Sequence, residues 1–136
     1  MDKHTPKQRS YNMSQIKNAD TKPELIFRKH VWTEGMRGYR TKSKITGKPD
    51  LFFSKKKIAV FIDGCFWHKC SKCYIRPKSN LKYWDKKIGQ NVTRDKTNTW
   101  LLQNQGIRVI RIWEHEVIEK PKKALARLKK TYEKVL

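Results

Sequence analysis

Two apolar runs joined by a short basic turn constrain the fold of this chain more than any other feature. The runs are residues 48–53 and 58–63, and residues 54–57 between them read Ser-Lys-Lys-Lys. Both runs are rich in Phe, Ile and Val, which favour strands, and their spacing is that of a β-hairpin. The sequence therefore predicts two antiparallel strands here.

A long helical pattern and a third strand follow the hairpin. Apolar residues recur at helical intervals from Leu81 to Asn104, Gly106 ends the pattern, and residues 107–113 form a strongly β-forming run. A helix between two strands acts as a crossover, so we expect the third strand to return to the same sheet.

Two further helices are predicted towards the ends of the chain. Thr21 and Glu24 form a capping box, and the helix that they begin should run from about Lys22 to Glu34. A closing helix is expected from Glu119 to Leu136. Residues 1–9 have the composition of a flexible basic arm, and residues 10–136 should form one domain. This order of elements predicts an α/β fold, with a mixed sheet flanked by helices.

The charge of the chain indicates a polyanionic partner. It has 33 Lys and Arg against 12 Asp and Glu, a formal net charge of +21, which favours nucleic acid binding. Ribosomal, chromatin and some membrane-surface proteins carry similar charge, so this feature does not indicate catalysis. There is no apolar leader and no apolar run near the about 18 residues of a membrane span, so a cytoplasmic protein is expected.

Three cysteines, Cys65, Cys70 and Cys73, lie within nine residues of one another. The odd number argues against a disulfide framework. Cys70 and Cys73 have the spacing of a zinc half-site, which Cys65 can join. The fourth ligand would be His68 or His115, and we favour His115 because this choice leaves His68 free for chemistry. A redox pair and simply buried thiols are the alternatives.

Carboxylates at the mouth of the hairpin form a second candidate site. Asp50 stands at the entrance of one strand and Asp63 at the end of the next, so antiparallel pairing can bring them side by side. Mg²⁺ needs only one or two carboxylates besides other oxygens, and Ile62 can offer its carbonyl. Glu24 is either a helix cap alone or a third acidic group. The plainer interpretation of both aspartates is that they bound a turn.

Aromatic side chains stand beside the proposed zinc ligands. Phe66 and Trp67 lie in a loop flanked by lysines, and proteins that deform DNA insert such residues, or Met, between base steps. With Trp84 and Met13 they are candidates for such a wedge, and packing in the core is the alternative for each.

Six segments of the chain together form one recognisable pattern: Arg9 to Met13, Thr21 to Glu24, Lys48-Pro49-Asp50, Phe61-Ile62-Asp63-Gly64-Cys65-Phe66-Trp67-His68, Tyr83 to Asp95, and Val109 to Glu114. From about Arg9 to His115 this pattern resembles the Vsr (very short patch repair) family of DNA mismatch endonucleases. The Gly-Cys-Phe-Trp-His string is its most specific part.

The resemblance implies a restriction-endonuclease-like core that hydrolyses double-stranded DNA 5′ to the T of a T:G mismatch, which 5-methylcytosine deamination leaves. By similarity, Asp50 would bind Mg²⁺ together with the Ile62 carbonyl. His68 would activate the attacking water, and Asp95 would orient His68. Glu24 matches an acidic residue of the family's active site.

The resemblance also implies a DNA-wedging role for the aromatic residues and Met13. Phe66 and Trp67 match residues that wedge beside the mismatch from the major groove, Trp84 would support them, and Met13 would enter from the minor groove. A monomer is expected, with other repair proteins as further partners.

The sequence departs from the best-known members at two places. Asp63 replaces a histidine, so we expect Asp63 to help bind Mg²⁺, and the second general acid or base is then Lys69 or a metal-bound water. Cys70 and His115 stand where those members have His and Cys, so the zinc ligand set is exchanged but complete.

Two other functions remain open at this level. Another restriction-like or structure-specific nuclease would keep Asp50 and the metal without needing the wedge residues. A zinc-stabilised DNA-binding protein without catalysis would explain the charge alone.

Overall fold

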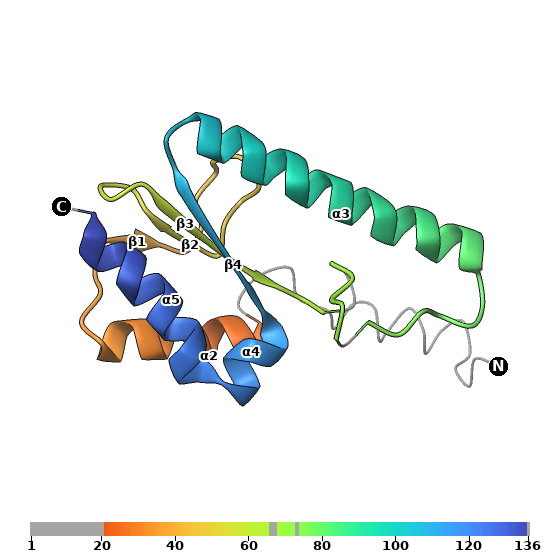
Figure 1. The fold of residues 1–136 in the computed structure, drawn as a ribbon, viewed down its shortest axis with the longest axis horizontal. Coiled ribbons are helices and arrows are strands. Elements are labelled where there is room, and N and C mark those ends of the chain that lie inside the picture. The colour runs from red at the N-terminus through yellow and green to blue at the C-terminus, as the bar shows by residue number, and fades with distance from the viewer. Residues whose placement is uncertain (1–20, 66–67, 73, 136) are drawn as a thin grey trace.

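A four-stranded mixed sheet lies between helices in the computed structural model, which describes residues 21–65, 68–72 and 74–135 (Figure 1). The elements are α2 (Lys22–Thr33), β1 (Tyr39–Arg40), β2 (Leu51–Phe53), β3 (Ile58–Asp63), α3 (Leu81–Asn104), β4 (Arg108–Trp113), α4 (Glu114–Glu119) and α5 (Pro121–Lys134). The predicted mixed α/β architecture is confirmed. Met13, Phe66, Trp67, Cys73 and the arm at 1–9 lie outside the described residues.

The strand order in the sheet is β1-β2-β3-β4. β2 and β3 pair antiparallel, with Leu51 opposite Val60, so the predicted hairpin is present. β4 pairs parallel with β3, with Phe61 opposite Arg111, so α3 is the crossover that the sequence predicts. The two-residue strand β1, which pairs antiparallel with β2, was not expected.

The C-terminal segment contains two helices where the sequence predicts one. α4 ends at Glu119, and Lys120 leaves the helical region with φ −136° and ψ 60°. Pro121 then occupies the first turn of α5. Proline disfavours the helical conformation of the residue before it, which explains the break at Lys120.

The two faces of the sheet bury different amounts of apolar surface because side chains alternate along each strand. Ile58 and Val60 of β3 join a large cluster with residues of α2, α4 and α5. Ala59 and Phe61 point to the other face, where they meet Leu102 of α3 in a much smaller cluster. Figure 1 shows α2, α4 and α5 on one side of the sheet and α3 alone on the other.

The long helix α3 covers its face of the sheet only in part. Of its 24 residues only Ile88 and Leu102 are fully buried. Its first half extends beyond the sheet, above the segment that follows β3 (Figure 1). Asp95 and Thr99 are four residues apart and therefore lie on one side of the helix. No helix in the described part of the chain is long and apolar enough to cross a membrane.

Candidate functional site

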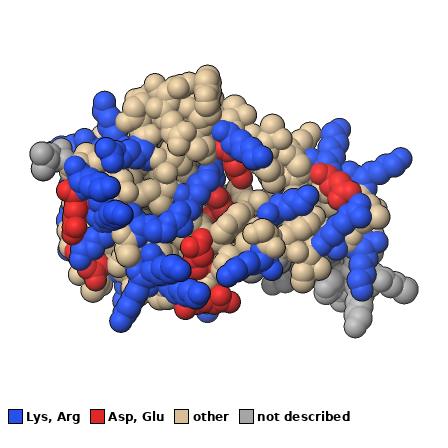
Figure 2. All heavy atoms as spheres, viewed as in Figure 1, with Lys and Arg blue, Asp and Glu red and all other residues tan. Residues whose placement is uncertain are grey.

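A polar cavity of about 900 Å³ opens where α2, α3 and the ends of β2 and β3 meet. Its lining includes all five residues predicted to be catalytic, which come from separate parts of the chain: Glu24, Asp50, Asp63, His68 and Asp95. Figure 2 shows Lys and Arg spread over the visible face and acidic atoms in a few isolated places between them. A pocket of carboxylates on so basic a protein needs a local explanation, which its contacts supply.

Asp50 is held by the hairpin itself. Its backbone amide donates to the carbonyl of Val60 at 2.9 Å, and its Oδ2 accepts a hydrogen bond from the amide of Ile62 at 2.6 Å. Burial raises the pKa of Asp50 to about 7, the carboxylates of Glu24 and Asp63 add to this rise, and the Ile62 amide opposes it. A carboxyl with this pKa takes up a proton near neutral pH, whereas a cation bound beside it would favour the charged form.

Glu24 serves both roles that the sequence leaves open. Its amide donates to Thr21 Oγ1 at 3.5 Å, which is the helix cap. Its side chain is buried, accepts a hydrogen bond from Arg28 at 3.3 Å and shares a hydrogen bond with Asp50. Two hard-oxygen groups in contact are the donor chemistry that Mg²⁺ takes in proteins, so the residues present fit that ion.

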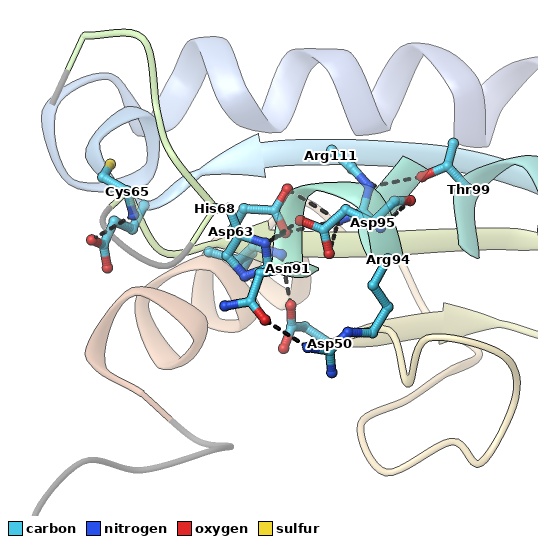
Figure 3. A network of polar contacts seen from close by, with 11 residues as sticks. Asp50, Asp63, Cys65, His68, Asn91, Arg94, Asp95, Thr99 and Arg111 are labelled. Atoms are coloured by element: carbon cyan, nitrogen blue, oxygen red, sulfur yellow. Dashed lines mark hydrogen bonds and ion pairs between the residues drawn. The ribbon is translucent and has the colours of Figure 1, made fainter. Parts of the chain in front are cut away.

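His68 stands between two carboxylates. Its Nδ1 donates a hydrogen bond to Asp95 Oδ2, and Asp63 Oδ1 lies 3.8 Å from the same nitrogen (Figure 3). Burial by itself would lower the pKa of His68, but the hydrogen bond that His68 donates to Asp95 and the charges of Asp63 and Asp95 outweigh it and raise the pKa. Because Nδ1 is engaged, Nε2 is the nitrogen left for a proton transfer.

Asp63 contacts a residue that sequence reasoning missed. Both of its carboxylate oxygens accept hydrogen bonds from Arg111 Nη1, at 2.9 and 3.1 Å. Burial raises the pKa of Asp63, while Arg111 acts against that rise. The sequence predicts Asp63 beside Asp50 as a metal ligand. In the structure its charge adds to the rise that burial causes in the pKa of Asp50, and its carboxylate also lies with His68 and Asp95, with ligand atoms within 4.8 Å of one another, a group that could hold a metal ion. The available signal for Arg111 was an arginine in the middle of the apolar run at 107–113, which also has an exposed arginine near its start, Arg108.

Three of the four predicted zinc ligands, Cys65, Cys70 and His115, lie together beyond the adjacent ends of β3 and β4. His115 Nδ1 is 3.2 Å from Cys65 Sγ and 3.6 Å from Cys70 Sγ, and both thiols are buried. Nitrogen and sulfur ligands about 2.1 and 2.3 Å from a tetrahedral zinc ion would be about 3.6 Å apart, so the three atoms fit that ion. Cys73 lies outside the described residues.

Glu114 and Trp84 each contact a residue close to the two candidate sites. Glu114 Oε1 accepts a hydrogen bond from the Cys65 amide at 3.0 Å, which fixes the loop after β3 to the start of α4. Trp84 is half-buried in the first turn of α3, where its ring meets that of Tyr83 edge-on at 5.1 Å between centroids. Tyr83 lines the cavity and Trp84 does not.

Comparisons with known proteins identify the family of this chain. Residues 1–74 match the family model described as DNA mismatch endonuclease Vsr. Over 128 residues the chain is 44% identical to the type II nicking enzyme V.HpaIIP of Haemophilus parainfluenzae, covering 90% of this chain and 89% of that protein.

Two further relatives support the same assignment. The type II nicking enzyme V.NmeAIP of Neisseria meningitidis is 42% identical over 118 residues, which cover 85% of this chain and 84% of that protein. The DNA mismatch endonuclease Vsr of Escherichia coli is 33% identical over 115 residues, covering 83% and 73%. The chain therefore belongs to the Vsr family of DNA mismatch endonucleases.

Proposed function

We propose that this protein nicks double-stranded DNA 5′ to the T of a T:G mismatch and so starts very short patch repair. One observation carries the proposal: the cavity brings Glu24, Asp50, Asp63, His68 and Asp95 together in a member of a DNA endonuclease family. The name of the relative in Escherichia coli, a DNA mismatch endonuclease, supports a mismatched substrate.

Mg²⁺ is the proposed catalytic ion, with Asp50 and the Ile62 carbonyl as its protein ligands and Glu24 beside them. When bound, the ion supplies positive charge at the scissile phosphate. Asp63 is the further ligand that the sequence predicts. Its oxygens already accept two hydrogen bonds from Arg111. We therefore propose that the main role of Asp63 is to help hold the His68 ring in place.

His68 is the proposed general base. Its Nδ1 is held by Asp95, so Nε2 can accept the proton of a water that attacks phosphorus. Lys69, or a water, is proposed to give the proton that the departing oxygen needs. The cavity thus contains a base with a fixed ring orientation, His68, together with two acidic groups that fit a cation, Glu24 and Asp50.

The proposed zinc ion is structural, with Cys65, Cys70, Cys73 and His115 as ligands. It would join the loop after β3 to α4, which follows β4, because Cys65 and His115 stand at those places. Metal analysis of the purified protein should find one zinc per chain. The variant Cys70→Ser should lose it and unfold at lower temperature, whereas Ser71→Ala in the same loop should keep both properties. Full zinc content in Cys70→Ser would contradict this ligand set.

The aromatic residues and Met13 are the proposed contacts to the mismatched DNA. Phe66 and Trp67, supported by Trp84, would enter beside the mismatch from the major groove, and Met13 from the minor groove. The sheet with its acidic pair at one end supports a restriction-endonuclease-like core. We expect the protein to act as a monomer in the cytoplasm, where other repair proteins would take over the nick.

The test uses end-labelled duplexes that carry T:G, C:G or T:A at one position, with and without Mg²⁺. We expect a Mg²⁺-dependent nick 5′ to the mismatched T. The variant Asp50→Asn should abolish it, whereas Asp85→Asn, an exposed aspartate paired with Arg76 on the protein surface, should not. Equal cutting of paired DNA would identify a general nuclease, and binding without cutting a non-catalytic module.

A second candidate function follows from the names of the relatives. Most of the relatives found are called type II nicking enzymes, so nicking could depend on the bases around the target. Repeating the assay with the T:G pair in varied flanking sequences separates the two: equal rates support mismatch recognition alone, and a single favoured sequence supports the second candidate.

A further inference from the structure

Arg111 joins three elements at the edge of the cavity. Its Nη1 donates to both oxygens of Asp63 at the end of β3, and its Nε donates to Thr99 Oγ1 of α3 at 2.9 Å. Its Nη2 donates to the backbone carbonyl of Asp95, also on α3, at 3.3 Å. Figure 3 shows the guanidinium between Thr99 on one side and the two aspartates on the other.

The sheet fixes where this guanidinium can lie. Arg111 is the register partner of Phe61 across the parallel β3–β4 pair, and its guanidinium carbon is 4.2 Å from the centre of the Phe61 ring. The side chain is only 22% exposed. A planar cation with several fixed donors suits this place, because it stacks on the ring while its edge donates to acceptors on three residues at once.

The two carboxylates beside His68 require a positive charge near them to balance their repulsion. Asp63 and Asp95 both lie against the imidazole, at a place largely removed from water. Two carboxylates this close repel each other strongly when partly buried, and without a counter-charge one would turn away or take up a proton. Arg111 Nη1 is 2.9 Å from Asp63 Oδ1 and 3.8 Å from Asp95 Oδ1, so it counters both.

We propose that Arg111 is a positioning residue of the nicking reaction. It holds Asp63 and Asp95 in the arrangement that fixes the His68 ring, and it keeps Asp63 turned to the histidine. Arg111 does not need to touch DNA for this role. The inference rests on the proposed function, because it assigns a task within the same site.

The decisive variant is Arg111→Gln, with Arg108→Gln as its matched control. Arg108 is an exposed arginine at the far end of the same strand. We expect Arg111→Gln to lower the single-turnover nicking rate at saturating protein by about 10- to 100-fold, the usual cost of a misplaced catalytic group. The dissociation constant for T:G duplex should stay within about threefold, since no phosphate contact is lost. Arg108→Gln should match the wild type in both.

A conservative variant and a spectrum separate positioning from mere stability. Arg111→Lys retains one positive charge beside Asp63, but its ammonium group cannot also donate to Thr99. Its single-turnover rate should therefore recover to about a tenth or more of the wild-type rate. The proton NMR spectrum of the wild type should show the sheltered Nδ1–H of His68, and Arg111→Gln should lose this signal while the protein remains folded by circular dichroism. If Arg111→Gln does not fold, Thr99→Val, which removes only one acceptor, replaces it with a smaller expected loss of rate.

The combination with Asp63→Asn shows whether Arg111 acts through Asp63. We expect the double variant to nick no more slowly than the slower single variant. An Arg111→Gln protein that nicks at the wild-type rate, or that retains the His68 signal, would overturn the inference. Weakened DNA binding with an unchanged rate would also overturn it, because it would make Arg111 a DNA contact. If the wild type itself does not nick, the proposed function fails, and the NMR comparison still tests the arrangement of His68.

Discussion

The side of the sheet covered by α2, α4 and α5 differs from the side covered by α3 in what it buries. Among the described residues, the first side holds a cluster of 13 buried apolar residues and the second a cluster of four. The second side instead carries the polar contacts of Asp63, His68, Asp95 and Arg111. The larger apolar core and the polar contacts of the proposed site therefore lie on opposite faces of one sheet.

This division has a physical reason. A pocket with the proposed role of admitting a phosphate and water cannot be filled with close-packed apolar side chains. The helix that forms its roof, α3, is anchored at its C-terminal half, where Leu102 packs on Ala59 and Phe61. The dense core on the far side of the same strands supplies the rigidity that holds the side chains of the proposed catalytic site in place.

The largest effect on the nicking rate is expected from a change on the polar face of the sheet. His68→Ala removes the proposed general base, so the nicking rate of T:G duplex should fall by about 10²- to 10⁴-fold. The urea midpoint should change little, because the side chain is partly exposed and belongs to no apolar cluster. His30→Ala, in α2, should leave both properties unchanged. Strong destabilisation by His68→Ala would contradict the division between the faces.

The apolar face should give the reverse result. Leu128 of α5 is 0% exposed and lies in the large cluster, so Leu128→Ala should lower the free energy of unfolding by about 2–5 kcal/mol. Urea denaturation measures this, with Leu25→Ala as control, because Leu25 is 50% exposed. At a temperature where the variant is folded, its nicking rate should equal that of the wild type. A slower reaction of the folded variant would show that the faces are not independent.

A smaller effect is expected from the partner of His68. Asp95→Asn keeps the size of the side chain but offers His68 a weaker, neutral acceptor, so the nicking rate should fall by about 10²-fold while DNA affinity is retained. Single-turnover kinetics and a binding titration measure the two quantities. Asp85→Asn on the same helix is the matched control. Asp95 would have no orienting role if both variants nicked at equal rates.

The smallest effect is expected from an ion pair that belongs to neither face. Arg76 and Asp85 are bonded at 2.7 Å on the open surface, and the hydrogen bond from Arg76 lowers the pKa of Asp85. Water and salt screen such a pair. Arg76→Gln should therefore not change the thermal midpoint measurably at physiological salt. A clear shift would show that the segment before α3 contributes to folding more than its exposure indicates.

Sequence reasoning predicts the parts of this fold that local patterns determine. The helix at Leu81–Asn104 and the strand run at 107–113 follow from apolar periodicity, and the hairpin follows from two runs and a short turn. The same patterns miss β1 and the short α4. A two-residue strand has no periodicity to detect, and α4 is separated from α5 only by the conformation of Lys120.

The candidate site was predictable to the extent that each residue carries its own signal. Asp50, Asp63, His68 and Asp95 stand in recognisable strings, and the structure brings them to one cavity. Arg111 could not be found in this way, because its role depends on a contact with Asp63 across 48 positions. A sequence shows an arginine in a strand, but only the parallel register shows which acid it meets.

The parallel pairing of β3 with β4 also sets the order in which the enzyme can become active during synthesis. The hairpin and His68 leave the ribosome well before Asp95, Arg111 and His115, which arrive with α3, β4 and α4. Pairing β4 with β3 closes a long loop, and such closures come late in folding. A nascent chain that already carries Asp50 and His68 therefore lacks the groups that position His68, and we expect it to remain unable to cut DNA until its last third has emerged and docked.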